Sequence, residues 1–203
     1  MKSATEPKPR TQKDKAKNMK GAAGKSAIRL KIRDAGEMTE YEAVVKRSGG
    51  ETLKISGSTY CDTKECITQI LKRALTGKRD LPPTAEKAVE HLINYLLTSI
   101  KQLHSGKASA TIWVGIGAED DLGLSVSLYR LDAGEAEDEE EYVGWVAEIT
   151  AMFSGYDGAA AVDGFHQFKK ELTLGRHLGD DAVKRLTEEL MKVAKMAYNV
   201  SPD

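Results

Sequence analysis

Several stretches of the chain carry residue types that could do chemistry, and the first of them ends like a phosphate-binding loop. It reads Gly21-Ala-Ala-Gly24-Lys25-Ser26. That motif also needs a glycine five residues before Gly24, where this chain has Met19, and it needs a strand before the loop and a helix after it. Here a polar basic segment precedes the stretch and a strand pattern follows it. We therefore do not interpret it as a nucleotide site.

The cysteines and histidines do not form a metal or nucleophile motif. Cys61 and Cys66 are five residues apart, whereas zinc-binding pairs are usually about two to four apart and need two further ligands. A helix N-terminus lowers the pKa of a thiol, so Cys66 is a candidate reactive thiol, although an ordinary partly buried cysteine is the favoured interpretation. No serine lies in a GxSxG motif. The four histidines belong to no catalytic or metal motif: His91, His104, His166 and His177.

One short linker is the best place for a polar site that sequence motifs do not reveal. It runs from Gly175 to Asp181 and includes an arginine, a histidine and two aspartates. Its simpler role is a glycine turn followed by an aspartate that caps the last helix. The candidate site residues are Arg176, His177, Asp180 and Asp181.

A strongly acidic segment spans Glu135 to Glu141. It could recruit calcium, mimic the phosphates of a nucleic acid, or pair with a basic segment of another copy. It lacks the ligand spacing and the glycine of an EF-hand loop. A solvated loop between two strands is the favoured interpretation.

The strongest set of candidate residues is basic and lies in the first half of the chain. Arg29, Lys31 and Arg33 alternate with apolar residues, which places all three on one face of a predicted strand. A basic sheet face can follow a phosphate backbone. The set lacks the exposed aromatic pairs that stack on single-stranded bases, so contacts would be electrostatic. A solvated face whose charges prevent aggregation is the simpler alternative. Neighbouring elements would add Lys46, Lys54, Lys72 and Arg73.

Charge is divided unevenly along the chain. Residues 1–81 hold 19 basic and 10 acidic side chains, whereas residues 82–203 hold 11 and 21. This asymmetry indicates a polyanionic partner or contacts between copies. The first 26 residues hold eight Lys and Arg with almost no large apolar side chains, so we expect a disordered basic arm. Its candidate contact residues are Lys13, Lys15, Lys17, Lys20 and Lys25.

Hydrophobic periodicity predicts the elements that must position these residues. Alternation predicts strands near 27–33, 41–47 and 52–56. Helical spacing predicts a helix that Asp62 caps and Gly77 ends, and a second helix over 84–104. In the second half we expect strands near 110–116, 122–128 and 142–153, followed by helices over 159–172 and 181–198.

This element order predicts an α+β protein with mostly antiparallel strands and two helix pairs. The order β-β-β-α-α occurs twice, as a tandem duplication would produce, and a single sheet packed against several helices explains it equally well. We expect a basic arm over 1–26, a basic unit over 27–106 and an acidic unit over 107–203. The two units either are separate or share one core.

The composition is that of a globular protein. The chain has 203 residues, 40% of them hydrophobic. We see no apolar run that would cross a membrane and no signal peptide. Two cysteines do not suggest a disulfide framework. We therefore expect a cytoplasmic protein without a cofactor or a metal.

These observations favour a non-enzymatic binding protein that contacts nucleic acid or another polyanion through the arm and the basic sheet face. The alternative is an assembly or adaptor protein whose oppositely charged halves bind another copy or a protein partner. The third hypothesis is an enzyme whose site forms only in three dimensions.

Overall fold

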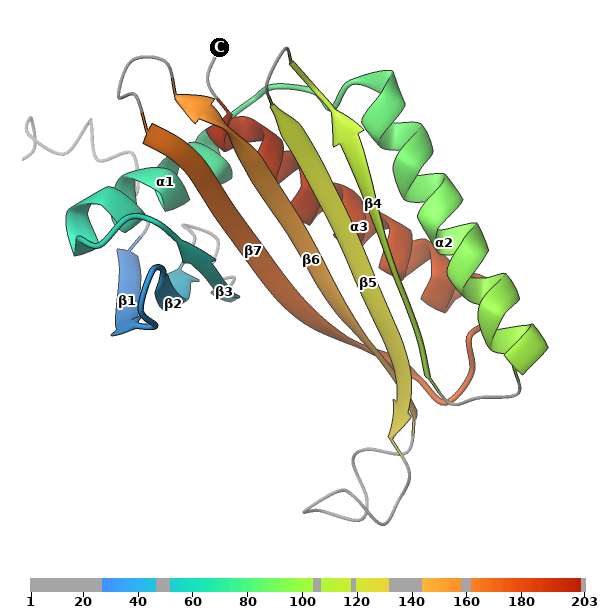
Figure 1. Cartoon of the computed structure of the whole chain (residues 1–203). Helices are drawn as coiled ribbons and strands as arrows, with labels where there is room; N and C mark the ends of the chain where they lie inside the picture. The colour runs from blue at the N-terminus through green and yellow to red at the C-terminus, as the bar shows by residue number, and fades with distance from the viewer. Residues whose placement is uncertain are drawn as a thin grey trace, which may run out of the picture.

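Seven antiparallel strands and three helices make up the part of the chain that the structure describes (Figure 1). The computed structural model describes residues 27–46, 52–103, 107–117, 120–131, 144–157 and 162–201. The strands are β1 (Ala27–Asp34), β2 (Thr39–Lys46), β3 (Thr52–Thr59), β4 (Lys107–Gly115), β5 (Asp121–Leu131), β6 (Gly144–Asp157) and β7 (Val162–Gly175). The helices are α1 (Lys64–Thr76), α2 (Pro83–Leu103) and α3 (Asp180–Val200).

The strands form one sheet in the order β1-β2-β3-β7-β6-β5-β4. Strands from both predicted units, 27–106 and 107–203, therefore lie in the same sheet. The helices cover one face: α3 packs on β6 and β7, and α2 packs along β4 (Figure 1). The other face carries no helix among the described residues. The α+β class and the antiparallel sheet are thus confirmed.

The core lies between the sheet and the helices. Leu122, Leu124, Val126 and Leu128 alternate along β5, and all four are fully buried. They face the apolar stripe of α3, which includes Leu186, Leu190 and Val193. The predicted stripe of α1 is likewise buried, at Ile67, Ile70, Leu71 and Ala74. None of the described helices is long and apolar enough to span a membrane.

The second predicted helix pair is wrong, because residues 162–175 form strand β7. Phe168 and Leu172 are four residues apart, so they fit both a helical stripe and one face of a strand. Pairing along the whole length of β6 fixes the strand. Because the described residues of the second half form four strands and one helix, the structure does not confirm a tandem duplication.

The helix ends differ in detail from the prediction. Thr63, not Asp62, is the N-cap of α1, and its Oγ1 accepts a hydrogen bond from the backbone N–H of Cys66 at 3.2 Å. Gly77 ends α1 as predicted. The N-cap of α3 is Gly179, with no side-chain capping bond. Cys61 and Cys66 form a disulfide across the start of α1, so Cys66 is not a free thiol in this structure.

The pairing between β3 and β7 is the shortest strand pairing in the sheet. Only two residue pairs join them, Ser56 with Lys169 and Thr59 with His166. A side chain from the next strand strengthens this junction, because the phenol of Tyr41 on β2 donates a hydrogen bond to the backbone oxygen of Gln167 at 2.9 Å. Burial raises the pKa of Tyr41, so the phenol stays a donor. The phenol passes β3 at Gly57, where a Cβ would lie 2.6 Å from its oxygen.

His166 supports the same junction from β7. Its Nδ1 lies 2.8 Å from the hydroxyl of Thr59, which is fully buried. The Thr59 oxygen also accepts a hydrogen bond from the backbone N–H of Cys61. Burial, with a smaller contribution from the positive charge of Arg73, lowers the pKa of His166 to about 4. The ring is therefore neutral at pH 7.

We predict that Gly57→Ala destabilises the protein by about 1–3 kcal/mol. The new methyl group would collide with the Tyr41 phenol and with the backbone of Gln167, which cannot move without breaking the junction. Urea unfolding measures the loss. Gly179→Ser is the control, because no atom lies within 4 Å of a Cβ at Gly179. An equal effect of both variants would contradict this account of the junction.

We also predict a pH-dependent loss of stability from His166. Its folded pKa lies below that of the unfolded chain, so its contribution is complete above pH 6.5 and is lost as the pH falls from about 6.5 to about 4. The full loss of unfolding free energy from His166 is on the order of 3 kcal/mol. Unfolding free energies across this range should decline less in His166→Gln than in the parent protein. The exposed His177→Gln is the control and should keep the parent's pH dependence.

Candidate anion-binding cleft

The basic face predicted for the first strand exists but is partly neutralised. Arg29, Lys31 and Arg33 are exposed on one face of β1, as alternation predicted. Two of these cations have a carboxylate partner on β2: Lys31 lies 3.7 Å from Glu42, and Arg33 lies 3.7 Å from Glu40. Both ion pairs are well exposed, so each contributes little to stability. They do lower the positive charge that an approaching anion would meet.

The other predicted basic residues are spread over several surfaces. Lys46 is exposed at the end of β2, and Lys72 and Arg73 are exposed on α1. Arg73 also donates a hydrogen bond to the backbone oxygen of Ser201 at 3.4 Å, which ties α1 to the end of α3. Lys54 lies on β3 beside β7. The arm residues Lys13, Lys15, Lys17, Lys20 and Lys25 and the acidic segment Glu135–Glu141 lie outside the described residues.

The candidate polar site between β7 and α3 remains a prediction. Arg176, His177, Asp180 and Asp181 are all exposed. Asp180 and Asp181 stand in the first turn of α3, where negative charge favours the helix dipole. None of the four lines either of the cavities described next.

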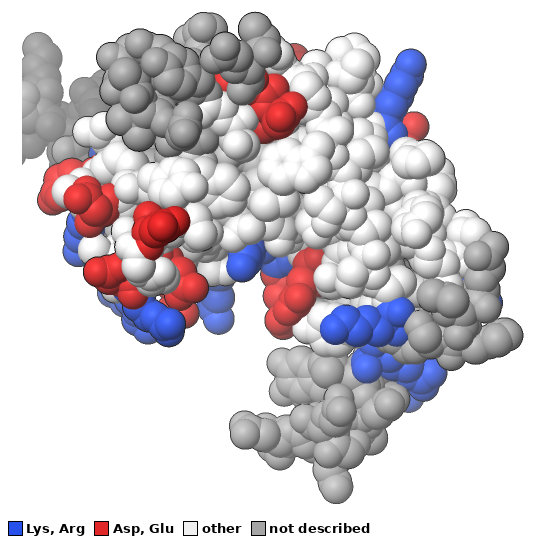
Figure 2. Space-filling view, in the orientation of Figure 1, with Lys and Arg blue, Asp and Glu red and all other residues white. Residues whose placement is uncertain are grey.

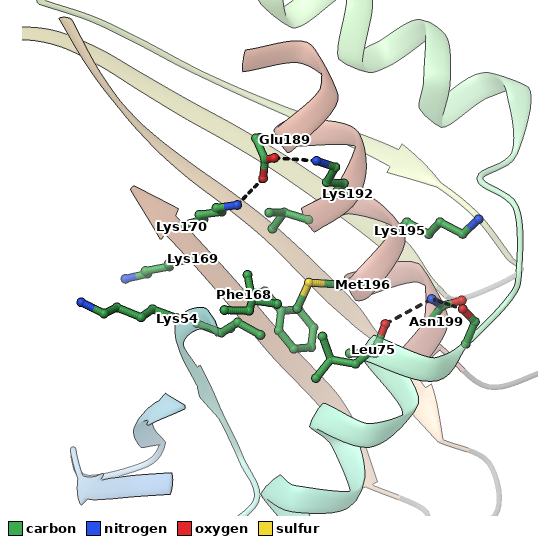
Figure 3. Close-up of a pocket in the computed structure, with 15 residues that line it drawn as sticks. Lys54, Leu75, Phe168, Lys169, Lys170, Glu189, Lys192, Lys195, Met196 and Asn199 are labelled. Carbon is green, nitrogen blue, oxygen red and sulfur yellow. Dashed lines mark hydrogen bonds and ion pairs between the residues drawn. The ribbon is translucent and has the colours of Figure 1, made fainter. Parts of the chain in front are cut away.

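The structure gathers lysines where β3 and β7 separate. Beyond Ser56 and Lys169 these strands are no longer paired. On the face of the sheet that carries the helices, α1 and α3 cover the gap between the two strands. The gap contains a cavity of about 220 Å³ (Figure 3). Its apolar lining includes Leu53, Ile55, Phe168, Val193 and Met196. Its charged lining consists of Lys54, Lys169, Lys170, Lys192, Lys195 and Glu189.

Three of the five lysines are already paired. Glu189 forms ion pairs with Lys170 and Lys192, the latter at 2.6 Å, and Lys195 lies 2.9 Å from Asp80. Burial alone would raise the pKa of Glu189, but hydrogen bonds and positive charge from Lys170 and Lys192 lower it. Lys54 and Lys169 have no ion pair with any described residue. Both side chains extend away from Phe168 (Figure 3).

A second hollow adjoins this cleft on the open face of the sheet. It has a volume of about 420 Å³ and is bounded by β1, β2, β3 and Lys169 of β7. Lys31 and Arg33, with their partners Glu42 and Glu40, line its far side. In Figure 2, basic and acidic side chains gather over β1, β2 and β3. Lys169 belongs to both cavities and therefore connects them.

Sequence reasoning found Lys54 but missed the other lysines of the cleft. Lys169 and Lys170 were assigned to a helix, and only a strand places one on the open face and the other toward α3. On α3, Glu189, Lys192, Met196 and Asn199 recur at intervals of three or four residues beside the apolar stripe. That spacing indicates a shared helix face, which could have been recognised as a polar lining.

The described residues contain no group of three or more His, Cys, Asp or Glu side chains that could hold a metal ion. No protein-family model matches the chain, and no curated protein and no solved structure is similar enough to count as a match. The function must therefore be inferred from the residues of the cleft and of the open face.

We predict that Glu189→Gln destabilises the protein by about 1 kcal/mol, because the partly buried Lys170 loses its counter-charge. Urea unfolding measures the change. Glu188→Gln removes the same charge from the next residue of α3, which is exposed, and should change stability by less than about 0.5 kcal/mol. Equal losses in the two variants would show that the ion pairs of Glu189 contribute nothing specific.

Proposed function

We propose that this protein is a non-enzymatic binding protein that contacts nucleic acid or another polyanion through a basic surface centred on Lys54 and Lys169. The observation that carries the proposal is that both side chains line one cavity at the junction of β3 and β7. Neither has a carboxylate partner among the described residues, so both are available to phosphate groups.

Further cations extend this basic surface in two directions. Lys31 and Arg33 lie across the adjoining hollow, where an approaching phosphate would compete with Glu42 and Glu40. Exposed ion pairs are weak, so this competition costs little. The basic arm over 1–26 would supply additional contacts, as its composition suggests. Contacts of this kind position a nucleic acid without reading its sequence.

An adaptor function is the second candidate, and one feature of the open face favours it. Trp113 on β4 is 51% exposed and lies beside Gly123 and Met152. Along the same two strands, serine and threonine side chains hydrogen-bond to one another, Ser109 with Ser127 and Thr111 with Ser125. Figure 2 shows a broad area without charged side chains on this face. An exposed tryptophan in an uncharged surface is typical of protein contacts.

The test is a binding titration with labelled duplex and single-stranded DNA and RNA at two salt concentrations. We predict that the double variant Lys54→Gln, Lys169→Gln binds about tenfold more weakly at low salt. The slope of the logarithm of its binding constant against the logarithm of salt concentration should decrease in magnitude by about one for each lysine removed. A version that lacks residues 1–26 measures the contribution of the arm separately.

The matched control is the double variant Lys87→Gln, Lys101→Gln. It removes the same charge from exposed positions of α2, which lies along β4 and away from the cleft. It should bind like the parent protein. Equal weakening in both double variants would show that binding depends only on the net charge of the protein. No binding by the parent protein at low salt would overturn the proposal and leave the adaptor function as the better explanation.

A further inference from the structure

The sheet has two edge strands, and they differ in what lies beside them. At one edge, α2 packs along β4 (Figure 1). At the other edge lies β1, and no described strand pairs with its outer side. Every residue of β1 is at least partly exposed. An edge of this kind presents unpaired backbone N–H and C=O groups and can accept a further strand from another chain.

The register of the hairpin of β1 and β2 shows which backbone groups face outward. At the turn, the N–H of Ala35 donates to the backbone oxygen of Met38 at 2.9 Å, so these residues form a hydrogen-bonded pair. Hydrogen-bonded and non-hydrogen-bonded pairs alternate along an antiparallel ladder, and β1 pairs with β2 in one continuous register. Arg29, Lys31 and Arg33 therefore direct their backbone groups to β2. The residues whose backbone groups point to the open edge are Ile28, Leu30 and Ile32.

The side chains of β1 add a charge pattern to this edge. Its three cations share the open face of the sheet, and the three apolar residues lie on the other face. Ile28 and Leu30 are partly buried against the core, whereas Ile32 is 44% exposed. An added strand would oppose the three cations in non-hydrogen-bonded pairs, where side chains on neighbouring strands come closest.

The strand that already pairs with β1 shows which residues suit these cations. On β2, Glu42 lies opposite Lys31 and Glu40 lies opposite Arg33, and both contacts are ion pairs. The third cation, Arg29, has no acidic residue opposite it on β2. An added strand with acidic residues at alternate positions would therefore give all three cations a carboxylate partner. Apolar residues between the acids would cover the exposed side chain on the other face.

The same charges disfavour a second copy of β1 as the added strand. Because the outward backbone groups belong to alternate residues, two antiparallel copies would place cations opposite cations, with Lys31 opposite Lys31 of the other copy in the centred register. Like charges directly opposite each other destabilise a strand pair. The edge therefore favours an acidic strand over another copy of itself.

We propose that the outer edge of β1 binds an extended segment of a partner protein in which acidic and apolar residues alternate. The segment adds to the sheet as a further strand. Its backbone hydrogen-bonds to the outward groups of β1, and its carboxylates lie opposite the three cations. This proposal does not depend on nucleic-acid binding at Lys54 and Lys169, although a nucleic acid would compete for Lys31 and Arg33.

The test measures binding of the fluorescently labelled synthetic peptide VEVEVEV to the full chain by fluorescence anisotropy. The peptide VVEEEVV has the same composition without the alternation, and VKVKVKV has the alternation with the opposite charge. We expect saturable binding of VEVEVEV and about tenfold weaker binding of the other two, because neither can place a carboxylate opposite every cation. Equal affinities for the two acidic peptides, or no saturable binding, would overturn the proposal.

Amide hydrogen exchange locates the bound peptide. In the free protein, the N–H groups of Arg29, Lys31 and Arg33 are bonded to β2 and should exchange slowly, whereas those of Leu30 and Ile32 should exchange quickly. Bound VEVEVEV should slow the exchange of Leu30 and Ile32. Binding that leaves these two exchange rates unchanged would place the peptide elsewhere and contradict the proposal.

One variant tests the backbone of the edge. Ile32→Pro removes an outward N–H that β2 does not use, a change that edge strands tolerate, and it should weaken binding of VEVEVEV at least about tenfold. Ile32→Val keeps this N–H and should bind like the parent protein. Circular dichroism verifies that both variants are folded, and unchanged binding by folded Ile32→Pro would contradict strand addition.

A second variant tests the charge pattern. Arg29→Glu reverses a charge that lies opposite Val44, so it adds no directly opposed carboxylates on β2. It should weaken binding of VEVEVEV and strengthen binding of VKVKVKV. Lys87→Glu makes the same change of net charge at an exposed position of α2 and should leave the preference of the parent protein unchanged. Equal effects of the two variants would show that the peptides respond to net charge alone and would overturn the proposal.

Discussion

The short junction between β3 and β7 is the constraint on which the rest of the structure depends. Seven strands form one sheet, yet only two residue pairs connect the first three strands to the last four. Side chains replace the missing ladder, since Tyr41 reaches the backbone of β7 past Gly57 and His166 hydrogen-bonds to the hydroxyl of Thr59. Both interactions are buried or partly buried, where hydrogen bonds are strong and unpaired groups are costly.

The cleft is a direct consequence of this junction. Once β3 leaves β7, no backbone ladder fills the space between them, and α1 and α3 must close it from behind. Polar contacts hold these two helices together at their ends. Arg79 donates to the backbone oxygens of Tyr198 and Ser201, and its guanidinium lies over the Tyr198 ring. Positive charge is favourable at the C-terminus of α3, so this arrangement stabilises the back of the cleft.

The spacing of apolar residues predicted most helices and strands. In each of these elements the buried positions recur with one period, either that of a helix or that of a strand. The alternation of Leu122, Leu124, Val126 and Leu128 identifies β5 unambiguously, and the last helix was expected almost at its observed bounds. Residues 162–175 could not be assigned in this way. Phe168 and Leu172 satisfy both periods, and the decision depends on pairing with β6, which is a property of the tertiary structure.

The candidate site was harder to predict because its members are distant in sequence and become neighbours only through that misassigned strand. Lys54 was selected for its place on a basic sheet face, but nothing near it in sequence indicates Lys169. Asn199 gives even less signal, since an asparagine near the end of a helix is ordinary on a solvated surface. Its significance comes from burial and from the carbonyl groups of α1 that orient it.

The charge asymmetry of the sequence also changes meaning in three dimensions. Lys169, Lys170, Lys192 and Lys195 belong to the acidic half of the chain, yet they line a cavity together with Lys54 of the basic half. Conversely, Glu40 and Glu42 of the basic half neutralise cations of β1. Screening limits interactions between exposed charges to about 8–10 Å at physiological salt. An approaching anion therefore senses the side chains within one such distance, and the two lysines without partners matter more than the net charge of either half.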